Sequence, residues 1–523
     1  MKKIFYALTA ALCALSPLCA QAPAIQWQNT IGGNTFDALN ILQQTSDGGY
    51  ILGGSSLSDI SGDKTENSLG SIDYWLVKLD ADGAIQWQNT IGGSSEDFLI
   101  TLQTTADGGY ILGGYSSSNI SGDKTENSNG GYDIWVVKLD ATGGIQWQNT
   151  IGGDSADNLN SIQQTVDGGY ILGGSSRSNI SGDKTENSKG NVDYWVIKLD
   201  ATGSIQWQNT IGATDYDWLQ SILLTTDGGY FLGGYSRSNI SSDKTENSLG
   251  ELDFWVVKLN ASGDIQWQNT IGGSGTDFLY SLQQTADGGY ILGGSSVSNI
   301  SGDKTENSNG FNDYWVVKLN DTGAIQWQNT IGGFFDDYLH SIQQTADGGF
   351  ILGGLSNSNV SGDKTEKTNG LTDFWVVKLN ALGAVQWQNT IGGEKADGLV
   401  SLQQTADGGY ILGGWSDSNI SGDKAENSFG EEDYWVIKLA PETVPTEEAP
   451  TATAIIYPNP TTDVLFVRSE TATTLCLHNS IGQILSTQTI QGQGEIDLSR
   501  YPNGIYFLVE METGIGHKIV KNK

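Results

Sequence analysis

The sequence predicts an all-β protein: a ring of seven four-stranded blades, a seven-bladed β-propeller, followed by a small separate β domain. Three observations predict this. The string IQWQNT begins at Ile25, returns every 60 residues up to Ile325, and appears as VQWQNT at Val385. Each repeat contains four short strand-like stretches and no helical periodicity. The chain has 70 Gly and 16 Trp but only 8 Pro, which is typical of many short strands joined by glycine turns.

Composition and charge limit the classes of partner. Aromatic residues make up 10% of the chain, which excludes a disordered chain. The formal net charge is −34, so the chain lacks the Lys and Arg that neutralise phosphates, and we expect no nucleic-acid partner and no binding to anionic membranes. Cations and neutral ligands such as sugars remain open. The alternative is that the acidity serves only solubility.

The first 22 residues have the pattern of a secretory signal peptide. Lys2 and Lys3 precede a short apolar run over residues 4–15, and Ala20-Gln21-Ala22 is a small-x-small cleavage site. We expect cleavage after Ala22. The apolar run is too short to span a bilayer comfortably and no other long apolar stretch follows, so we expect no transmembrane segment. Removal of the signal would leave Cys476 as the only cysteine, which excludes an intramolecular disulfide.

The repeat around residue 160 illustrates the expected elements. Residues 159–165 form a first strand, the Asp-Gly-Gly at 167–169 a hairpin turn, and residues 170–176 a second strand. A long polar loop then leads to a third strand over 194–199, rich in β-branched and aromatic residues. A short turn at 200–203 precedes the fourth strand over 205–211.

The phase of the repeat separates a closed ring from an open solenoid. The array begins with a lone fourth strand at 25–31 and ends with a third strand at 434–439 that has no fourth strand after it. Every blade has four strands if the N-terminal strand completes the last blade. This arrangement also removes the free sheet edges. A solenoid, the alternative, has no use for this offset. We therefore predict a propeller over residues 23–440.

Tryptophans recur at two places in every repeat. A residue repeated in every blade favours packing between blades over a ligand site. The repeats, with the pattern DGGYILGG followed by DYWVVKLD, resemble β-propeller repeats common in secreted bacterial proteins. This resemblance implies the fold and says little about function. The two sets are Trp27, Trp87, Trp147, Trp207, Trp267, Trp327 and Trp387 on the fourth strand, and Trp75, Trp135, Trp195, Trp255, Trp315, Trp375 and Trp435 on the third.

A second domain follows a linker. Residues 441–454 are rich in Pro, Thr and Glu, and the 60-residue period stops after them. Residues 455–523 resemble the type A sorting domain of the type IX secretion system of Bacteroidota. The resemblance implies a small Ig-like β-sandwich, recognition by the type IX secretion machinery, and a final location at the outer cell surface or outside the cell. It rests above all on Tyr457, Pro458, Asn459, Pro460, Gly504, Tyr506 and Lys518.

Catalytic residues are scarce in the repeats. His340 is the only histidine there, and it lies on a first strand, where it either faces the central channel or is incidental. Carboxylate pairs are mostly repeated sevenfold, whereas an active site in a ring breaks the symmetry. Asp336-Asp337 is the least repetitive pair, and even Asp337 has a counterpart in every blade. We therefore expect no enzymatic activity. The alternative is an extracellular polysaccharide lyase or hydrolase acting at the channel mouth.

The polar loop SGDKTENS suggests a cation site. Its carboxylates, together with the Asp just before the third strand, are hard oxygen ligands of the kind that Ca²⁺ prefers. The spacing does not match an EF-hand, and Lys64 offsets part of the charge. The alternative is that these side chains cap turns. The candidate ligands in the first two repeats are Asp63, Glu66, Asp73, Asp123, Glu126 and Asp133.

Differences among the seven repeats concentrate in two connections: the second-to-third loop and the exit from the fourth strand. In antiparallel blades both connections emerge on one face of the disc, and there the large aromatic residues vary most. Exposed aromatics suit sugars or protein partners. We expect a monomeric binding or adhesion protein with a glycan or protein ligand; neutral drift of the loops, or a structural surface coat, are the alternatives. The candidate ligand-binding residues are Tyr115, Tyr235, Trp415, Phe334, Phe335, Tyr338 and Trp218.

Overall fold

The computed structural model describes residues 21–442, 454–479, 483–511 and 516–522. Residues 1–20 of the expected signal peptide (1–22) and most of the expected linker therefore lie outside the described residues. The chain divides into two compact units, the first ending at Glu442 and the second beginning at Thr443. Every regular element in the described residues is a β-strand. Among the described residues, none forms a helix with the length and apolarity that crossing a bilayer requires.

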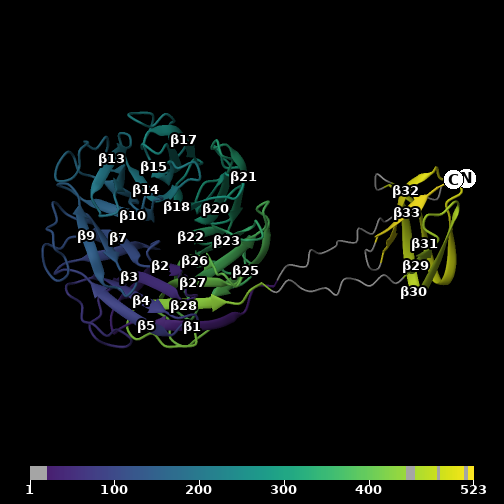
Figure 1. The fold of residues 1–523 in the computed structure, drawn as a ribbon, viewed down its shortest axis with the longest axis horizontal. Helices are drawn as coiled ribbons and strands as arrows, with labels where there is room; N and C mark the ends of the chain where they lie inside the picture. The colour runs from purple at the N-terminus through teal and green to yellow at the C-terminus, as the bar shows by residue number, and fades with distance from the viewer. Residues whose placement is uncertain (1–20, 443–453, 480–482, 512–515, 523) are drawn as a thin grey trace, which may run out of the picture. The chain divides into compact units, whose positions relative to one another are not determined.

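The larger unit is a seven-bladed β-propeller (Figure 1). Each blade is a four-stranded antiparallel sheet, and the innermost strand of every blade contacts that of the next, with β2 and β26 completing the circle. Blades are numbered here from β2 onward, so blade 7 consists of β26, β27, β28 and β1. The predicted fold class is confirmed.

The strand bounds repeat with the period of the sequence. The innermost strands are β2 (Asp37–Gln44), β6 (Asp97–Thr104), β10 (Asp157–Gln164), β14 (Asp217–Leu224), β18 (Asp277–Gln284), β22 (Asp337–Gln344) and β26 (Asp397–Gln404). The second strands are β3 (Tyr50–Ser56), β7 (Tyr110–Ser116), β11 (Tyr170–Ser176), β15 (Tyr230–Ser236), β19 (Tyr290–Ser296), β23 (Phe350–Ser356) and β27 (Tyr410–Ser416). The third strands are β4 (Asp73–Leu79), β8 (Asp133–Leu139), β12 (Asp193–Leu199), β16 (Asp253–Leu259), β20 (Asp313–Leu319), β24 (Asp373–Leu379) and β28 (Asp433–Leu439). The outermost strands are β5 (Ile85–Ile91), β9 (Ile145–Ile151), β13 (Ile205–Ile211), β17 (Ile265–Ile271), β21 (Ile325–Ile331), β25 (Val385–Ile391) and β1 (Ile25–Ile31).

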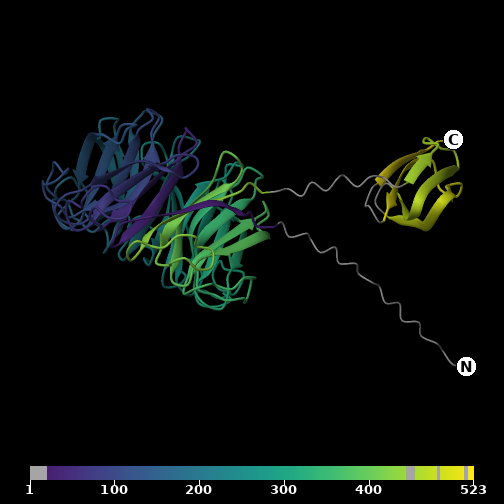
Figure 2. The ribbon, with the colours of Figure 1, turned by 90° about the horizontal axis from the view of Figure 1, so that it is seen from below.

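The ring closes through the N-terminal strand. β1 pairs antiparallel with β28, with Ile31 opposite Tyr434 and Thr30 opposite Trp435, the register that β13 and β12 adopt inside one continuous blade. In Figures 1 and 2 the purple β1 lies among the yellow-green strands of blade 7. This is the pairing that the phase of the repeat predicts. It leaves no blade with an unpaired third strand.

Blades pack against each other through the third-strand tryptophans, as the sequence predicts. The Tyr74 ring lies 4.9 Å from that of Trp135 in the next blade, and its hydroxyl donates to the Trp135 carbonyl at 3.1 Å. Tyr434 of blade 7 makes the same two contacts with Trp75 of blade 1. All seven of these tryptophans are fully buried. The blade completed by the N-terminal strand therefore packs on blade 1 as the other blades pack on their neighbours.

Strand connections define two faces. The turns within each blade, such as 45–49 and 80–84, form the turn face. The second-to-third loops, such as 57–72, and the connections between blades, such as 92–96, form the loop face. The first strands line the central channel, where a cavity of about 290 Å³ is bounded partly by a glutamine ring at the Gln43 position.

The smaller unit contains β29 (Ala454–Tyr457), β30 (Val464–His478), β31 (Ile484–Asp497), β32 (Gly504–Glu510) and β33 (Gly516–Lys521). β30 pairs with β29, β31 and β32, and residues from both of its ends, Leu465 and Leu477, contribute to one apolar core. The smaller unit is thus a separate small β domain, as the sequence predicts.

Candidate functional site

The loop face of blade 4 carries a pocket of about 440 Å³. Its walls combine aromatic side chains with one cationic and one anionic group. It lies where β14 and β15 of blade 4 approach β18 of blade 5. The lining residues are Tyr216, Trp218, Tyr235, Arg237, Glu251, Leu252 and Phe278.

Strand pairing fixes the aromatic wall. Trp218 on β14 stands directly opposite Tyr235 on β15. The Tyr235 ring meets Phe278 of the next blade edge-on, with ring centroids 5.0 Å apart and planes at 88°. Burial raises the pKa of Tyr235 to about 12, so its hydroxyl stays protonated at neutral pH. This wall presents rigid apolar faces with a hydroxyl among them.

Polar groups stand at the rim of the pocket. The Arg237 side chain is exposed and its Nε lies 3.7 Å from an Asp215 carboxylate oxygen. On the other side, Glu251 accepts a hydrogen bond from the Thr276 hydroxyl at 3.3 Å. Neither contact is short, which leaves both charged groups able to bond a ligand that enters the pocket.

Blade 2 shows why blade 4 is hollow. Phe98 and Tyr115 occupy the positions of Trp218 and Tyr235, and their ring centroids lie 5.2 Å apart. Tyr132 adds a third ring 5.4 Å from Tyr115, and its hydroxyl bonds Glu96. In blade 2 the aromatic side chains therefore fill the space with one another. Blade 4 has Leu252 at the position of Tyr132, and the space stays open.

The other predicted ligand-binding residues lie on the loop face but in separate blades. Phe334 and Phe335 form an exposed edge-to-face pair with centroids 5.3 Å apart. Tyr338 is half-buried, and its hydroxyl accepts from the Asn312 amide at 2.9 Å. Trp415 lies flat on Gly398, where a Cβ would meet the indole at 2.5 Å. The structure thus joins Trp218 with Tyr235 and joins neither of them with the remaining candidates.

Of the seven lining residues, only Trp218 and Tyr235 are among the predicted ligand-binding residues, and Glu251 and Leu252 are the hardest of the others to predict. Glu251 and Leu252 precede the third strand of blade 4, in a stretch where each repeat has a different residue pair. Neither is aromatic, so a search for surplus aromatics passes over them. The signal that would have marked this blade is the combination of aromatic residues at 216, 218 and 235 with a residue at 252 that carries no ring.

The carboxylates of the SGDKTENS loops bind the protein's own N–H groups. Glu66 accepts from the Thr90 backbone N–H at 2.7 Å, and Asp73 accepts from the Leu69 N–H at 2.6 Å. Asp63 faces the Gly32 N–H at 3.4 Å. Asp123, Glu126 and Asp133 make the equivalent contacts with backbone N–H groups in blade 2. Within the described residues, no three His, Cys, Asp or Glu side chains converge as a metal site. These carboxylates therefore bond backbone N–H groups of the protein itself, and calcium binding by them stays a prediction.

Each of these loops also carries a buried lysine, whose charge lies close to the carboxylates. Lys64 is 1% exposed, donates to the Ser56 hydroxyl at 2.7 Å, and lies 5.6 Å from the centre of the Trp75 ring. The charges of Asp37 and Asp73 partly offset the burial that lowers its pKa. The Lys64 ammonium group therefore lies among the acidic side chains that the sequence suggested as metal ligands.

His340 bridges two blades. Its Nδ1 lies 2.8 Å from the Leu399 carbonyl oxygen of the next blade, and Asn40 makes the equivalent bond to Leu99 at 2.7 Å. Because a carbonyl only accepts, Nδ1 carries the proton. Burial lowers the pKa of His340, which keeps the ring neutral. This histidine acts as an inter-blade donor in the same way as its asparagine counterpart.

In the smaller unit, several residues of the expected sorting motif hold the fold. The Asn459 amide donates to the Lys518 carbonyl at 2.6 Å, and its oxygen accepts from the Val520 N–H at 2.9 Å. The Tyr506 hydroxyl donates to the Pro502 carbonyl at 2.5 Å. Gly504 pairs with Lys521 at the start of β32. Tyr457 is 46% exposed and is the motif's largest accessible side chain.

Residues 455–522 match the protein family described as the secretion system C-terminal sorting domain. The smaller unit is a type IX secretion sorting domain. The sorting domain marks the chain for export through the type IX machinery to the cell surface or the extracellular space. The predicted location is confirmed, and the propeller is the domain that is exported with the sorting domain.

The propeller itself has more distant similarities. A curated relative, regulatory protein FlaEY of Caulobacter vibrioides, is 26% identical in an alignment of 305 residues that covers 51% of this chain and 30% of that protein. The chain therefore matches less than a third of that relative's length. The WD40 domain of Neurospora crassa Pan2 is 11% identical, with 78% of this chain and 95% of that chain covered and a TM-score of 0.41. Puromycin hydrolase is 12% identical, with 86% and 62% covered and a TM-score of 0.44.

Proposed function

We propose that this protein is an exported binding protein whose blade-4 pocket takes a sugar unit of an extracellular glycan. One observation carries the proposal: seven blades are nearly equivalent, and only blade 4 places aromatic residues at all three of the positions 216, 218 and 235. Residues repeated sevenfold maintain the scaffold. A combination found in a single blade serves a single site.

The lining suits a sugar ring. The Trp218 and Tyr235 faces are apolar and rigid, so they stack on the C–H face of a pyranose at little cost in side-chain entropy. Arg237 and Glu251 at the rim supply donors and acceptors for hydroxyl groups. The volume of about 440 Å³ lies within the range of small-ligand sites.

The titratable side chains that line the pocket favour binding over catalysis. Glu251 is the one carboxylate among the lining residues. Glycoside hydrolysis generally uses two carboxyl groups flanking the scissile bond. His340, the histidine of the repeats, is engaged in a bond between blades. The site therefore offers recognition groups without an acid–base pair.

Export defines the ligand's compartment. The sorting domain delivers the propeller to the cell surface or beyond, where capsular, matrix and host polysaccharides are accessible. An adhesive role follows if the sorting domain leaves the protein attached to the cell, and a scavenging role follows if it is released.

The test is a glycan array probed with residues 23–523, followed by titration of the best ligand. Trp218→Ala and Tyr235→Ala should each weaken binding at least tenfold, because buried aromatic anchors commonly contribute about 1–4 kcal/mol each. The matched control is Phe334→Ala with Phe335→Ala, two exposed aromatics on the same face outside the pocket.

Two outcomes would contradict the proposal. Glycan binding that survives Trp218→Ala and disappears in the Phe334/Phe335 control would move the site to blade 6. Absence of any glycan ligand, together with capture of a purified surface protein that depends on Trp218, would make the ligand a protein.

A further inference from the structure

The innermost strands carry a ring of glutamines around the central channel. The position of Gln43 is glutamine in six blades and leucine in blade 4. Each glutamine oxygen accepts from a backbone N–H of the next blade, as Gln43 does from Thr104 at 2.9 Å. The ring therefore joins neighbouring blades. The same bond links Gln103 to Gln164, Gln163 to Leu224, Gln283 to Gln344, Gln343 to Gln404 and Gln403 to Gln44.

These bonds fix the orientation of each carboxamide. A backbone N–H only donates, so the atom that faces it is the oxygen Oε1 and the amide nitrogen Nε2 points elsewhere. The Nε2 groups of the six glutamines make no hydrogen bond to any residue that the structure describes. Each amide therefore keeps two N–H groups that can donate to a ligand.

Five of the six glutamines line one cavity of about 290 Å³ in the channel. They belong to blades 6, 7, 1, 2 and 3, whose innermost strands follow one another around the ring (Figure 1). Their side chains are half-buried, so the channel has access to them. Gln283 lies outside the lining, beside the blade in which Leu223 replaces glutamine. The five are Gln43, Gln103, Gln163, Gln343 and Gln403.

The wall of the channel is electrically neutral. After its first Asp, each innermost strand contains no acidic or basic residue apart from His340, and burial lowers the pKa of that ring and keeps it neutral. The first Asp is itself buried and bonded: Asp37 accepts from the Gly33 N–H at 2.6 Å. The described residues that line the cavity include no carboxylate. An anion in this cavity therefore meets amide donors, although the chain carries a net charge of −34.

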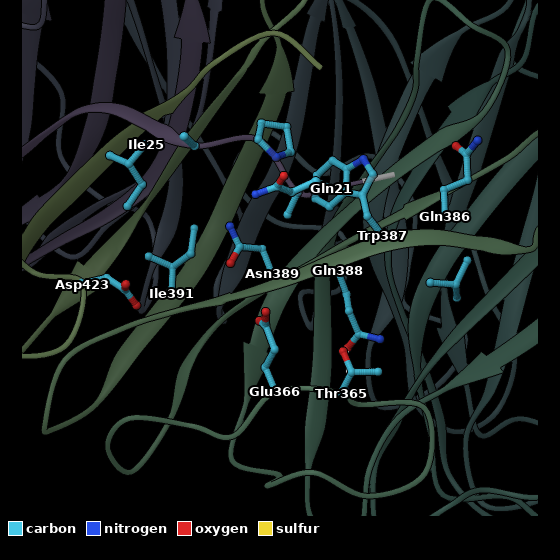
Figure 3. Close-up of a pocket in the computed structure, with 14 residues that line it drawn as sticks. Gln21, Ile25, Thr365, Glu366, Gln386, Trp387, Gln388, Asn389, Ile391 and Asp423 are labelled. Carbon is cyan, nitrogen blue, oxygen red and sulfur yellow. Dashed lines mark hydrogen bonds between the residues drawn. The ribbon is translucent and has the colours of Figure 1, made fainter. Parts of the chain in front are cut away.

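A groove of about 590 Å³ beside the seam, where β1 joins β28, has a different character. Gln21 and Ile25 of the N-terminal segment lie in it beside Trp387 (Figure 3). Ile25 packs on the apolar cluster that contains the buried Trp387, and Glu366 accepts from the Thr390 N–H at 2.7 Å. This groove is therefore part of the packing of blade 6 against the N-terminal segment, whereas the channel cavity presents a set of unused donors.

We propose that the channel cavity binds a small oxyanion, such as sulfate or a carboxylate. The oxygens of one such ion each accept from the amide of a different blade, whereas a halide presents a single acceptor atom. Hydrogen bonds to a charged acceptor are roughly twice as strong as neutral ones, so uncharged amides can hold the ion. The site lies on the side of the channel away from blades 4 and 5, and its occupancy does not depend on the blade-4 pocket.

The probe is sodium sulfate, titrated into residues 23–523 in a zwitterionic buffer and followed by isothermal titration calorimetry. Sodium acetate and sodium chloride are titrated in parallel. We expect saturable binding of an oxyanion, with chloride about tenfold weaker; the tighter of sulfate and acetate identifies the class. Gln43→Glu should weaken binding about tenfold, because the carboxylate keeps the bond from Thr104 but removes a donor to a charged acceptor and repels the anion.

Gln283→Leu is the matched control. It removes the same kind of bond between blades at a glutamine that does not line the cavity, and Leu223 shows that the fold accepts leucine at this position. Oxyanion affinity should be unchanged in this variant. Gln43→Leu should lower the affinity about tenfold, with a change in melting temperature no greater than that of Gln283→Leu.

Four results would overturn the proposal. The first is a wild-type protein that shows no saturable oxyanion binding at millimolar concentration. The second is binding that survives both Gln43→Glu and Gln43→Leu. The third is an equal loss of affinity in Gln283→Leu, which would assign the effect to the joining of the blades. The fourth is chloride binding as tight as that of either oxyanion.

Discussion

Blade 3 and blade 7 hold the same four strands in the same register, yet only blade 3 is made from one continuous stretch of chain. In blade 3 the turn at 200–204 joins β12 to β13. In blade 7, β28 and β1 come from opposite ends of the propeller and still pair residue for residue. The difference teaches that the strand sequences determine the pairing, and that the pairing of the third and fourth strands does not require a covalent turn between them.

The largest expected effect comes from removing β1. Deleting residues 23–33 leaves β28 as an unpaired edge and uncovers the core around Ile31 and Tyr434. We expect a loss greater than the ~3–5 kcal/mol typical of a single buried aromatic deletion, seen as a large drop in melting temperature. Adding a peptide of residues 23–33 should restore part of it. An unchanged melting temperature would show that the seam contributes nothing.

A matched pair of core substitutions compares the two blades directly. Trp195 in blade 3 and Trp435 in blade 7 are both fully buried, and each indole N–H bonds a glutamine at 3.1 Å. Trp195→Ala and Trp435→Ala should each cost about 3–5 kcal/mol of unfolding free energy, because each leaves a large cavity. Chemical denaturation measures both. A much smaller cost at Trp435 would mean that the seam is loosely packed.

Acid titration provides a third comparison. Burial raises the pKa of Asp133 in blade 2 and of Asp433 in blade 7 to about 6, from an ordinary value of 3.8. The folded state therefore holds more protons than the unfolded state between these values, so this contribution to stability is full below about pH 4 and is lost as pH rises through 6.

Melting temperature should thus fall between pH 4 and pH 7. Asp133→Asn and Asp433→Asn should flatten that slope by similar amounts, since an amide keeps the acceptor and does not titrate. Melting curves across this range test both variants. A slope that is unaltered by either substitution would place the responsible protons elsewhere.

The smallest expected effect lies inside a continuous blade. Ser242 has a φ of 48° where six repeats have glycine at 52–55°. The following backbone bond, from Asp243 to Gly212, is 3.2 Å long, against 2.8 Å at Asp63. Ser242→Gly should raise the unfolding free energy by about 1 kcal/mol, the approximate cost of a left-handed residue with a side chain. Gly182→Ser in blade 3 should lower it similarly, and equal stabilities would contradict the reasoning.

The sequence predicted the fold closely because the fold depends on local patterns repeated seven times. Strands expected at 170–176 and 205–211 are present with those bounds, and those expected to start at 159 and 194 begin two residues and one residue earlier. The offset of the repeat implied the β1–β28 pairing. The recurrence of the third-strand tryptophans also predicted that they pack between blades, as the structure shows.

The sites followed less well, because they depend on which side chains meet. Sequence comparison ranked Phe334 and Phe335 beside Trp218 and Tyr235, since all four break the repeat. Only the tertiary structure showed that the first pair projects into solvent and that the second lines a pocket. The sequence pattern suggested the loop carboxylates as calcium ligands because it does not show their backbone N–H donors or the buried Lys64 beside them.

What the sequence by itself determined is therefore the ring, its seven blades and its export address. These rest on periodicity, turn residues and contiguous motifs, which act through neighbours in the chain. What only the tertiary structure decided is the open space, namely the aromatic-walled pocket on the loop face of blade 4. An unfilled volume depends on atoms from several strands at once, and no single stretch of sequence contains it.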